Sequence, residues 1–144
     1  MFFLGDIIDR GPQSFEAMEL VIQTLDELPG SKLLRGNHED FVLRFLDIAF
    51  TRHYDLMNWM WNGGAATALS YGVPPNALAR TRRRHSDAIP KMRAALDRHP
   101  VHIETMRNAE HMIIERGLVF VHAGLRPEVS LAPQSLDDLM TIRH

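Results

Sequence analysis

Apolar residues in the first forty positions alternate between short runs and one helical stripe, which predicts a strand, a helix and a second strand. Phe2 to Gly5 is an apolar run suited to a buried strand, and Lys32 to Leu34 is another. Between them, Ser14 can cap a helix that Pro29-Gly30 ends. The apolar positions of this helix recur at spacings of three and four and comprise Phe15, Met18, Ile22 and Leu25.

The rest of the chain predicts helices and short strands in mixed order. Past Asn37 an amphipathic pattern predicts a helix that covers the sheet. The further expected elements are a helix over Ala65 to Tyr71, an exposed connection over Ala79 to Asp87, a helix over Pro90 to Arg98, strands over Val101 to Thr105, Met112 to Glu115 and Leu118 to Val121, and a helix over Ser135 to Met140. The last two strands can form a hairpin across Arg116-Gly117.

The order of these elements predicts an α/β fold. A right-handed crossover would make the first two strands parallel, so that Asp6 and Asn37 emerge together at the carboxyl edge of the sheet. Open α/β sheets bind ligands at that edge. The strand ends therefore predict a site that contains Asp6 and Asn37.

Composition narrows the class of protein and the chemistry of the site. With 144 residues, 45% of them apolar and 24% charged, the sequence predicts one globular domain or part of one. The net charge of −2 favours neither nucleic acid nor a membrane surface as a partner. The apolar start is too short for a leader and no later run could span a bilayer, so we expect a cytoplasmic protein. Cysteine is absent, which leaves His, Asp, Glu and Asn as metal ligands.

The polar residues at the strand ends are those that phosphoester hydrolysis needs. Cations must neutralise the phosphate oxygens, a water must be activated, and an acid must protonate the leaving oxygen. Asp6 could bridge two cations, and Asn37 and His122 offer neutral ligands. The candidate groups for binding and protonating the substrate are Arg10, whose fork of donors matches phosphate, and His38, whose pKa a partner carboxylate such as Asp9 would raise.

Three ordered motifs make a family resemblance specific. They are Gly5-Asp-Ile-Ile-Asp-Arg-Gly11, Gly36-Asn-His-Glu39 and His122-Ala-Gly124. Together they resemble the calcineurin-like metallophosphoesterases, and within them the phosphoprotein phosphatase family of serine/threonine phosphatases. The segments Trp61-Asn-Gly-Gly and His122-Ala-Gly-Leu-Arg-Pro127 resemble the bacterial branch of that family.

The resemblance implies an α/β/β/α sandwich with two divalent metal ions, usually Mn, Fe or Zn. Metal-activated hydroxide would attack phosphorus directly, with a phosphorylated protein or a small phosphoester as substrate. By motif, Asp6 would bridge both metals and Asn37 and His122 would bind the second. The motifs further imply that Arg10 holds phosphate, that His38 and Asp9 form the acid pair, and that Arg143 is a second phosphate-binding arginine.

The chain also departs from the family pattern. An Asp-x-His motif upstream of Gly5 and a Gly-His motif near the end are both absent, which predicts that residues 1–144 are a partial domain with exposed sheet surface. Glu39 is expected in the first turn of a helix, where negative charge is favourable, and is not counted as a ligand.

Three functions remain open at this point. The first is a serine/threonine protein phosphatase. The second is a dinucleoside polyphosphate hydrolase, because related enzymes share the site. The third is a catalytically impaired fragment that binds phosphate or one metal weakly. Trp59 and Trp61 could line a substrate groove, although large aromatics at a helix end are more often core residues. The run Arg82-Arg-Arg84 more often marks a solvated face than a nucleic-acid site.

Overall fold

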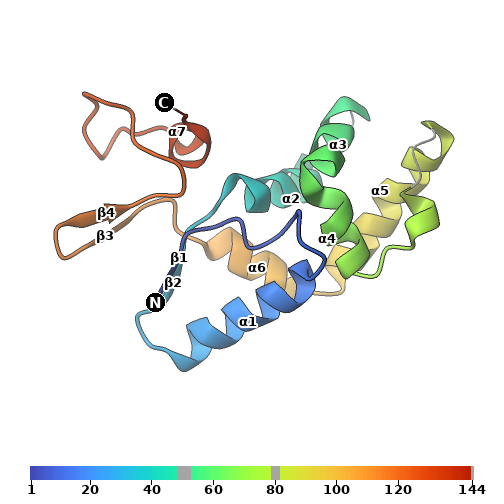
Figure 1. The fold of residues 1–144 in the computed structure, drawn as a ribbon, viewed down its shortest axis with the longest axis horizontal. Helices are drawn as coiled ribbons and strands as arrows, with labels where there is room; N and C mark the ends of the chain where they lie inside the picture. The colour runs from blue at the N-terminus through green and yellow to red at the C-terminus, as the bar shows by residue number, and fades with distance from the viewer. Residues whose placement is uncertain (49–52, 79–81, 144) are drawn as a thin grey trace.

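The fold is described by a computed structural model that covers residues 1–48, 53–78 and 82–143 (Figure 1). The strands are β1 (Phe2–Phe3), β2 (Lys32–Leu33), β3 (Ile113–Glu115) and β4 (Leu118–Phe120). The helices are α1 (Ser14–Glu27), α2 (Asn37–Ile48), α3 (His53–Trp59), α4 (Ala65–Ser70), α5 (Arg82–Asp97), α6 (Pro100–Asn108) and α7 (Leu136–Thr141), with a π-helical turn η1 (Met60–Gly64) and a 3₁₀ turn η2 (Pro75–Ala77). Within these residues, no helix is long and apolar enough to cross a membrane.

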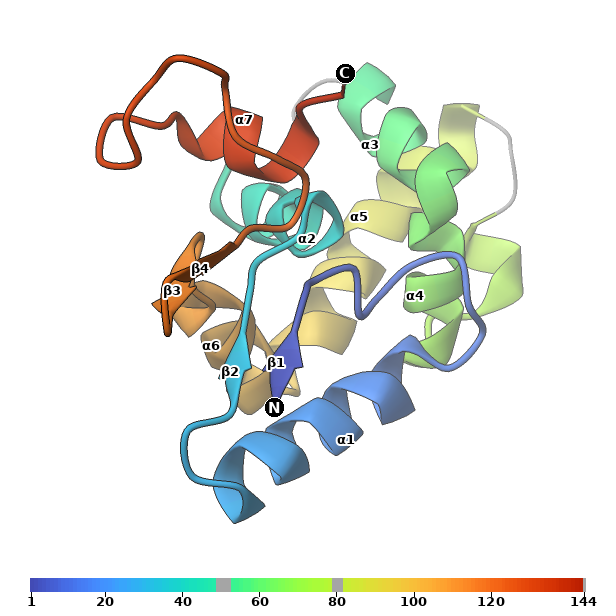
Figure 2. The same ribbon diagram turned by 60° about the vertical axis from the view of Figure 1, so that its left-hand side comes forward.

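The predicted strand, helix and parallel strand at the start of the chain are confirmed. β1 pairs with β2 in parallel, with Phe2 opposite Lys32 and Phe3 opposite Leu33, and α1 connects the two strands (Figure 2). Val21 of α1 packs with Leu33 in a small apolar cluster beside the sheet. Because both strands run in the same direction, the loops at their carboxyl ends lie next to each other.

Ser14 begins α1 but does not cap it, which corrects the prediction made for its side chain. Gln13 is the residue before the helix, and its side chain makes no capping hydrogen bond; the Phe15 N–H in the first turn donates to Ser70 Oγ at 2.8 Å instead. The buried Ser14 hydroxyl instead accepts a hydrogen bond from the backbone N–H of Asp9, at 3.1 Å. The hydroxyl is thus used to hold the preceding loop.

Most of the apolar core lies between helices rather than on a sheet. Phe45 of α2, Trp59 of α3, Met92 of α5 and Met106 of α6 are essentially inaccessible to solvent and belong to one cluster. The described strands form two separate two-stranded sheets, β1–β2 and β3–β4. Helices and small sheets agree with the predicted α/β class, whereas the α/β/β/α sandwich stays a prediction.

Two predicted segments are wrong. Val101 to Thr105 lies inside α6 rather than in a strand, because Pro100 takes the first helical position and the buried His102 and Met106 are four residues apart. Arg82 to Asp87 belongs to α5 rather than to a connection, in keeping with the good helix propensity of arginine. Residues 79–81 lie outside the described ranges.

The carboxyl-terminal elements match the sequence prediction closely. β3 and β4 form an antiparallel hairpin, and Arg116 and Gly117 at its turn have φ of 50° and 78°. Two successive positive φ values are typical of a tight turn between antiparallel strands. Ser135 caps α7 by accepting a hydrogen bond from the Asp138 N–H at 3.0 Å.

Candidate metal and phosphate site

The carboxyl ends of β1 and β2 meet through two glycines. A Cβ atom added to Gly5 would lie 2.5 Å from the Gly36 nitrogen, and one added to Gly36 would lie 2.4 Å from Asp6 Oδ1. The two loops are in direct contact, so neither position has room for a side chain. Asp6 has φ of 55°, a left-handed conformation that is uncommon outside glycine and asparagine-like residues. This contact places the Asp6 carboxylate beside the start of α2.

Three predicted metal ligands converge at this edge. His122, which follows β4, brings its Nε2 atom within 3.3 Å of Asp6 Oδ1 and within 3.3 Å of Asn37 Oδ1. Its other ring nitrogen, Nδ1, lies 2.6 Å from the Leu4 carbonyl oxygen. The convergence joins loops that are far apart in the sequence, and Figure 2 shows the segment after β4 passing beside the end of β2.

The bonding of His122 favours a cation between these donors. A carbonyl only accepts, so Nδ1 carries the ring proton that is donated to Leu4, and a neutral ring then presents a lone pair at Nε2. In the neutral ring, that lone pair faces the oxygens of Asp6 and Asn37. Ligand atoms about 2.0–2.2 Å from one metal lie roughly 3 Å apart, close to the spacing here. The donor set fits one divalent ion.

The three candidate metal donors include an amide oxygen in addition to a carboxylate and a histidine. Among the residues whose side chains the structure describes (1–47, 56–78 and 88–143), no group of three or more His, Asp or Glu side chains is arranged to hold a metal ion. Asp6 and His122 supply two such ligands, and the third donor is the amide oxygen of Asn37. Of the ligands that the family resemblance implies for a further ion, the described residues supply Asp6 alone.

The predicted acid pair is formed next to the metal donors. His38, with 1% of its surface exposed, places Nδ1 at 2.6 Å from Asp9 Oδ2. The hydrogen bond that Asp9 accepts from His38 raises the pKa of His38, and burial opposes that rise. His38 Nε2 also lies 3.8 Å from Asp6 Oδ2, so the two parts of the site are adjacent.

Arg10 points at His38 in this structure. Its Nη2 atom lies 2.8 Å from His38 Nε2. A guanidinium only donates hydrogen bonds, so Nε2 accepts and Nδ1 donates to Asp9. The structure therefore has His38 neutral with Arg10 at the nitrogen that an acid would use. The side chain predicted to hold phosphate is beside the predicted proton donor.

The sequence reasoning missed the residues that hold Asp9. Its Oδ2 accepts a hydrogen bond from Trp59 Nε1 at 2.9 Å, and its Oδ1 accepts one from Thr67 Oγ1 at 2.5 Å. The predicted core position of Trp59 is confirmed, but Trp61, 66% exposed, is not a core residue. The tryptophan and threonine contacts anchor Asp9 to α3 and α4, and no local pattern pointed to them.

The Asn62-Gly-Gly segment supports Arg10. The Arg10 N–H donates to the Gly63 carbonyl at 3.3 Å, and a Cβ on Gly63 would lie 2.4 Å from the Arg10 nitrogen. Gly63 also has φ of 115°, where a side chain would be strained. A glycine is required here for two independent reasons. The segment that carried part of the family resemblance thus packs against the loop of the site.

Arg143, the second predicted phosphate ligand, is exposed just after α7. Among the described residues it makes no hydrogen bond or ion pair with the other site residues, so its role stays a prediction. The segment that carries it is nevertheless tied to the site. Ala123, next to His122, donates its N–H to the Leu139 carbonyl at 2.8 Å, and Arg126 pairs with Asp138 at 2.7 Å.

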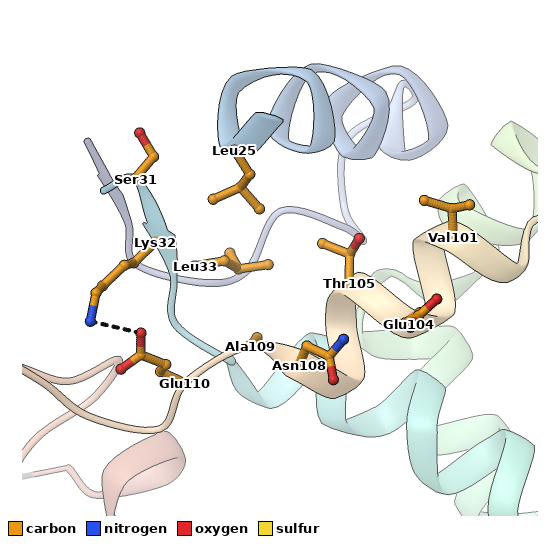
Figure 3. Close-up of a pocket in the computed structure, with 10 residues that line it drawn as sticks. All are labelled: Leu25, Ser31, Lys32, Leu33, Val101, Glu104, Thr105, Asn108, Ala109 and Glu110. Carbon is orange, nitrogen blue, oxygen red and sulfur yellow. Dashed lines mark ion pairs between the residues drawn. The ribbon is translucent and has the colours of Figure 1, made fainter. Parts of the chain in front are cut away.

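A cavity of about 390 Å³ lies elsewhere, between α1, β2 and α6 (Figure 3). Lys32, the one lysine or arginine among the described residues that line it, forms an ion pair with Glu110 at 3.0 Å. Glu104 adds a further negative charge to the lining. None of the predicted site residues lines this cavity, and its charge does not suit a phosphate.

Two comparisons with known proteins bear on the family to which the chain belongs. A search of curated proteins finds no match for the chain. The family model described as calcineurin-like phosphoesterase matches residues 1–143. This range includes all three motifs and every residue of the site described above. The chain therefore belongs to the calcineurin-like phosphoesterase family.

Proposed function

We propose that this protein is a metal-dependent serine/threonine protein phosphatase. Membership of the family supports metal-dependent phosphoester hydrolysis in general. The observation that carries the proposal is the contact between the metal donors and the acid pair: His122 Nε2 lies 3.3 Å from Asp6 Oδ1, and His38 Nε2 lies 3.8 Å from Asp6 Oδ2. A phosphate bound beside Asp6 would lie within reach of both groups.

Asp6, Asn37 and His122 would hold a divalent ion, and manganese suits their oxygen and imidazole donors. The family resemblance implies two ions in the complete site, and among the described residues Asp6 is the one donor that the further ion would have. When bound, the ions would neutralise phosphate oxygens and make a water molecule acidic enough to attack phosphorus. Asp6 and His122 are both partly accessible, with side chains 28% and 15% exposed, so water and substrate can approach them.

Arg10 and His38 would act in sequence on the substrate. An incoming phosphate competes for the Arg10 guanidinium, because a charged, bidentate partner binds it better than a neutral imidazole. Once Arg10 has turned to the phosphate, His38 Nε2 is released and can take up a proton. Asp9 stabilises the resulting imidazolium through the bond at Nδ1. His38 then donates the Nε2 proton to the departing oxygen of the substrate.

The acid pair favours alcohol phosphates over dinucleoside polyphosphates. Serine and threonine leave as strongly basic alkoxides and need a proton, whereas a polyphosphate is cleaved with a weakly basic phosphate as the leaving group. Dinucleoside polyphosphate hydrolysis is the second candidate, because that reaction uses the same metal and phosphate groups.

Substrate assays with metal removal test the proposal. With Mn²⁺ added, we expect the chain to hydrolyse a phosphoserine or phosphothreonine peptide faster than diadenosine tetraphosphate, measured as phosphate release. Chelation with EDTA should abolish the activity, and added Mn²⁺ should restore it. Preferential cleavage of the dinucleotide would reassign the substrate. Mn²⁺ binding in calorimetry without hydrolysis of any substrate would favour the catalytically impaired alternative.

Replacing His38 tests its role as an acid. We expect His38→Gln to lower kcat for a phosphoserine peptide by roughly 10²–10⁴-fold, the usual contribution of a positioned acid. The loss should be much smaller for p-nitrophenyl phosphate, because nitrophenolate leaves without a proton. His99→Gln, which changes a histidine that has no role in the site, is the matched control. An equal loss on both substrates would contradict proton donation by His38.

A further inference from the structure

Glu39 is a buried carboxylate that no step of the proposed reaction uses. It has 0% of its surface exposed, although it lies in the first turn of α2. Its Oε2 accepts hydrogen bonds from the backbone N–H groups of Asp6 at 2.9 Å and Gly36 at 2.8 Å. Its Oε1 accepts one from Ile7 at 2.8 Å. Among the described residues, no lysine, arginine or histidine forms an ion pair with it.

These three bonds join the two loops that carry the metal donors. Asp6 and Ile7 follow β1, whereas Gly36 follows β2 and directly precedes Asn37. One side chain therefore ties the backbone of one proposed ligand to the backbone next to another. Without this carboxylate, three buried or half-buried N–H groups would lack their acceptor, at a cost of about 1–3 kcal/mol for each such group.

The bonds also maintain an unusual backbone conformation at Asp6. Its φ of 55° is one that L-residues rarely adopt, and such conformations persist where surrounding bonds impose them. The direction of the Asp6 side chain depends on that conformation. Since Asp6 Oδ1 must face His122 Nε2 and Asn37 to share a cation with them, the N–H bonds to Glu39 decide where the first donor points.

Helix-dipole stabilisation does not explain this arrangement. Asp40 is the next residue in the same first turn, and it pairs at the surface with Arg44 at 2.5 Å. An acidic residue at this end of a helix gains its favourable energy without being buried. Glu39 is instead fully buried and bonds to three backbone N–H groups in two loops. This burial indicates a task beyond capping.

We propose that Glu39 is a positioning residue that fixes the Asp6 carboxylate for cation binding by clamping the loops after β1 and β2. The inference rests on the proposed function only in assigning a metal to Asp6, Asn37 and His122. It is distinct from a ligand role, because both Glu39 oxygens are already occupied by backbone donors.

Glu39→Gln is the direct test, with Asp40→Asn as its matched control. Glutamine has the same shape but only one acceptor oxygen, so either orientation places its NH₂ group against a backbone donor. We expect Glu39→Gln to weaken Mn²⁺ binding by about 10–100-fold in calorimetry, as is typical when a group that orients a ligand is lost. Asp40→Asn removes the same charge from the same helical turn and should change the affinity less than threefold. Equal affinities of Glu39→Gln and the unmodified chain would overturn the proposal.

Hydrogen exchange in the unmodified chain tests the same idea if Glu39→Gln does not fold. Coupling between two sites is reciprocal, so a cation that depends on the clamp must also stabilise it. We expect Mg²⁺ at saturating concentration to slow amide exchange at Asp6, Ile7 and Gly36. Unchanged exchange at all three amides would contradict the proposal. Both measurements use metal binding alone, so a chain that binds metal but hydrolyses nothing would refute the proposed function and leave the Glu39 inference standing.

Discussion

Asp6→Asn is expected to abolish metal binding and phosphatase activity while making the metal-free protein more stable. Asparagine tolerates the left-handed backbone of Asp6, so the loop can keep its conformation. The substitution removes the only charged ligand of the three donors. The affinity for Mn²⁺ should fall by more than the roughly 10–100-fold that is typical for groups outside the ligand shell.

The gain in stability has a specific cause. In the metal-free chain, Asp6 Oδ1 and the His122 Nε2 lone pair face each other at 3.3 Å. The side-chain amide introduced by Asp6→Asn could instead donate a hydrogen bond to that nitrogen, which is worth about 1 kcal/mol, and would give up only the long 3.4 Å bond that Asp6 Oδ1 accepts from the His38 N–H. Thermal unfolding at pH 8 without metal measures the gain, and calorimetry with Mn²⁺ measures the loss of affinity. Asp26→Asn, on an exposed part of α1, is the control. Unchanged metal affinity in Asp6→Asn would contradict the assigned site.

Asp9→Ala is expected to lower the free energy of unfolding by about 3–5 kcal/mol, the usual cost of removing one member of a buried, charged network. The Asp9 carboxylate accepts hydrogen bonds from His38 Nδ1, Trp59 Nε1 and Thr67 Oγ1. Alanine would leave these buried donors without their acceptor and would open a cavity. Urea unfolding followed by tryptophan fluorescence measures the change, and Asp47→Ala at the surface is the control.

Asp9→Asn separates hydrogen bonding from charge. Its amide oxygen can still accept from His38 and Trp59, and its NH₂ group can donate to the Thr67 hydroxyl, which is free to rotate. We expect a loss of only about 1–3 kcal/mol for this variant. Both variants remove the carboxylate whose hydrogen bond raises the pKa of His38, so both should lose activity on phosphoserine peptides. Equal destabilisation by Asn and Ala would show that the hydrogen bonds contribute little.

The local pattern of the sequence determined the first β-α-β unit and the position of two site residues. Residues spaced three or four apart predicted α1, apolar runs predicted β1 and β2, and the parallel pairing placed Asp6 and Asn37 at one edge. The turn at Arg116-Gly117 was also predicted, because turn chemistry depends on neighbouring residues alone. The assignment of His122, Arg10 and His38 needed the motifs, since no periodicity connects them.

Contacts across long stretches of chain were decided only by the tertiary structure. Trp59 and Thr67 bond to Asp9 across 50 and 58 residues, and Gly63 packs against Arg10. The burial of Glu39 depends on three amides that belong to other loops. The sequence specified which chemical groups are present and which strand ends carry them. Only the packed chain decides which donor meets which acceptor, because that depends on the approach of distant segments rather than on the preference of any one of them.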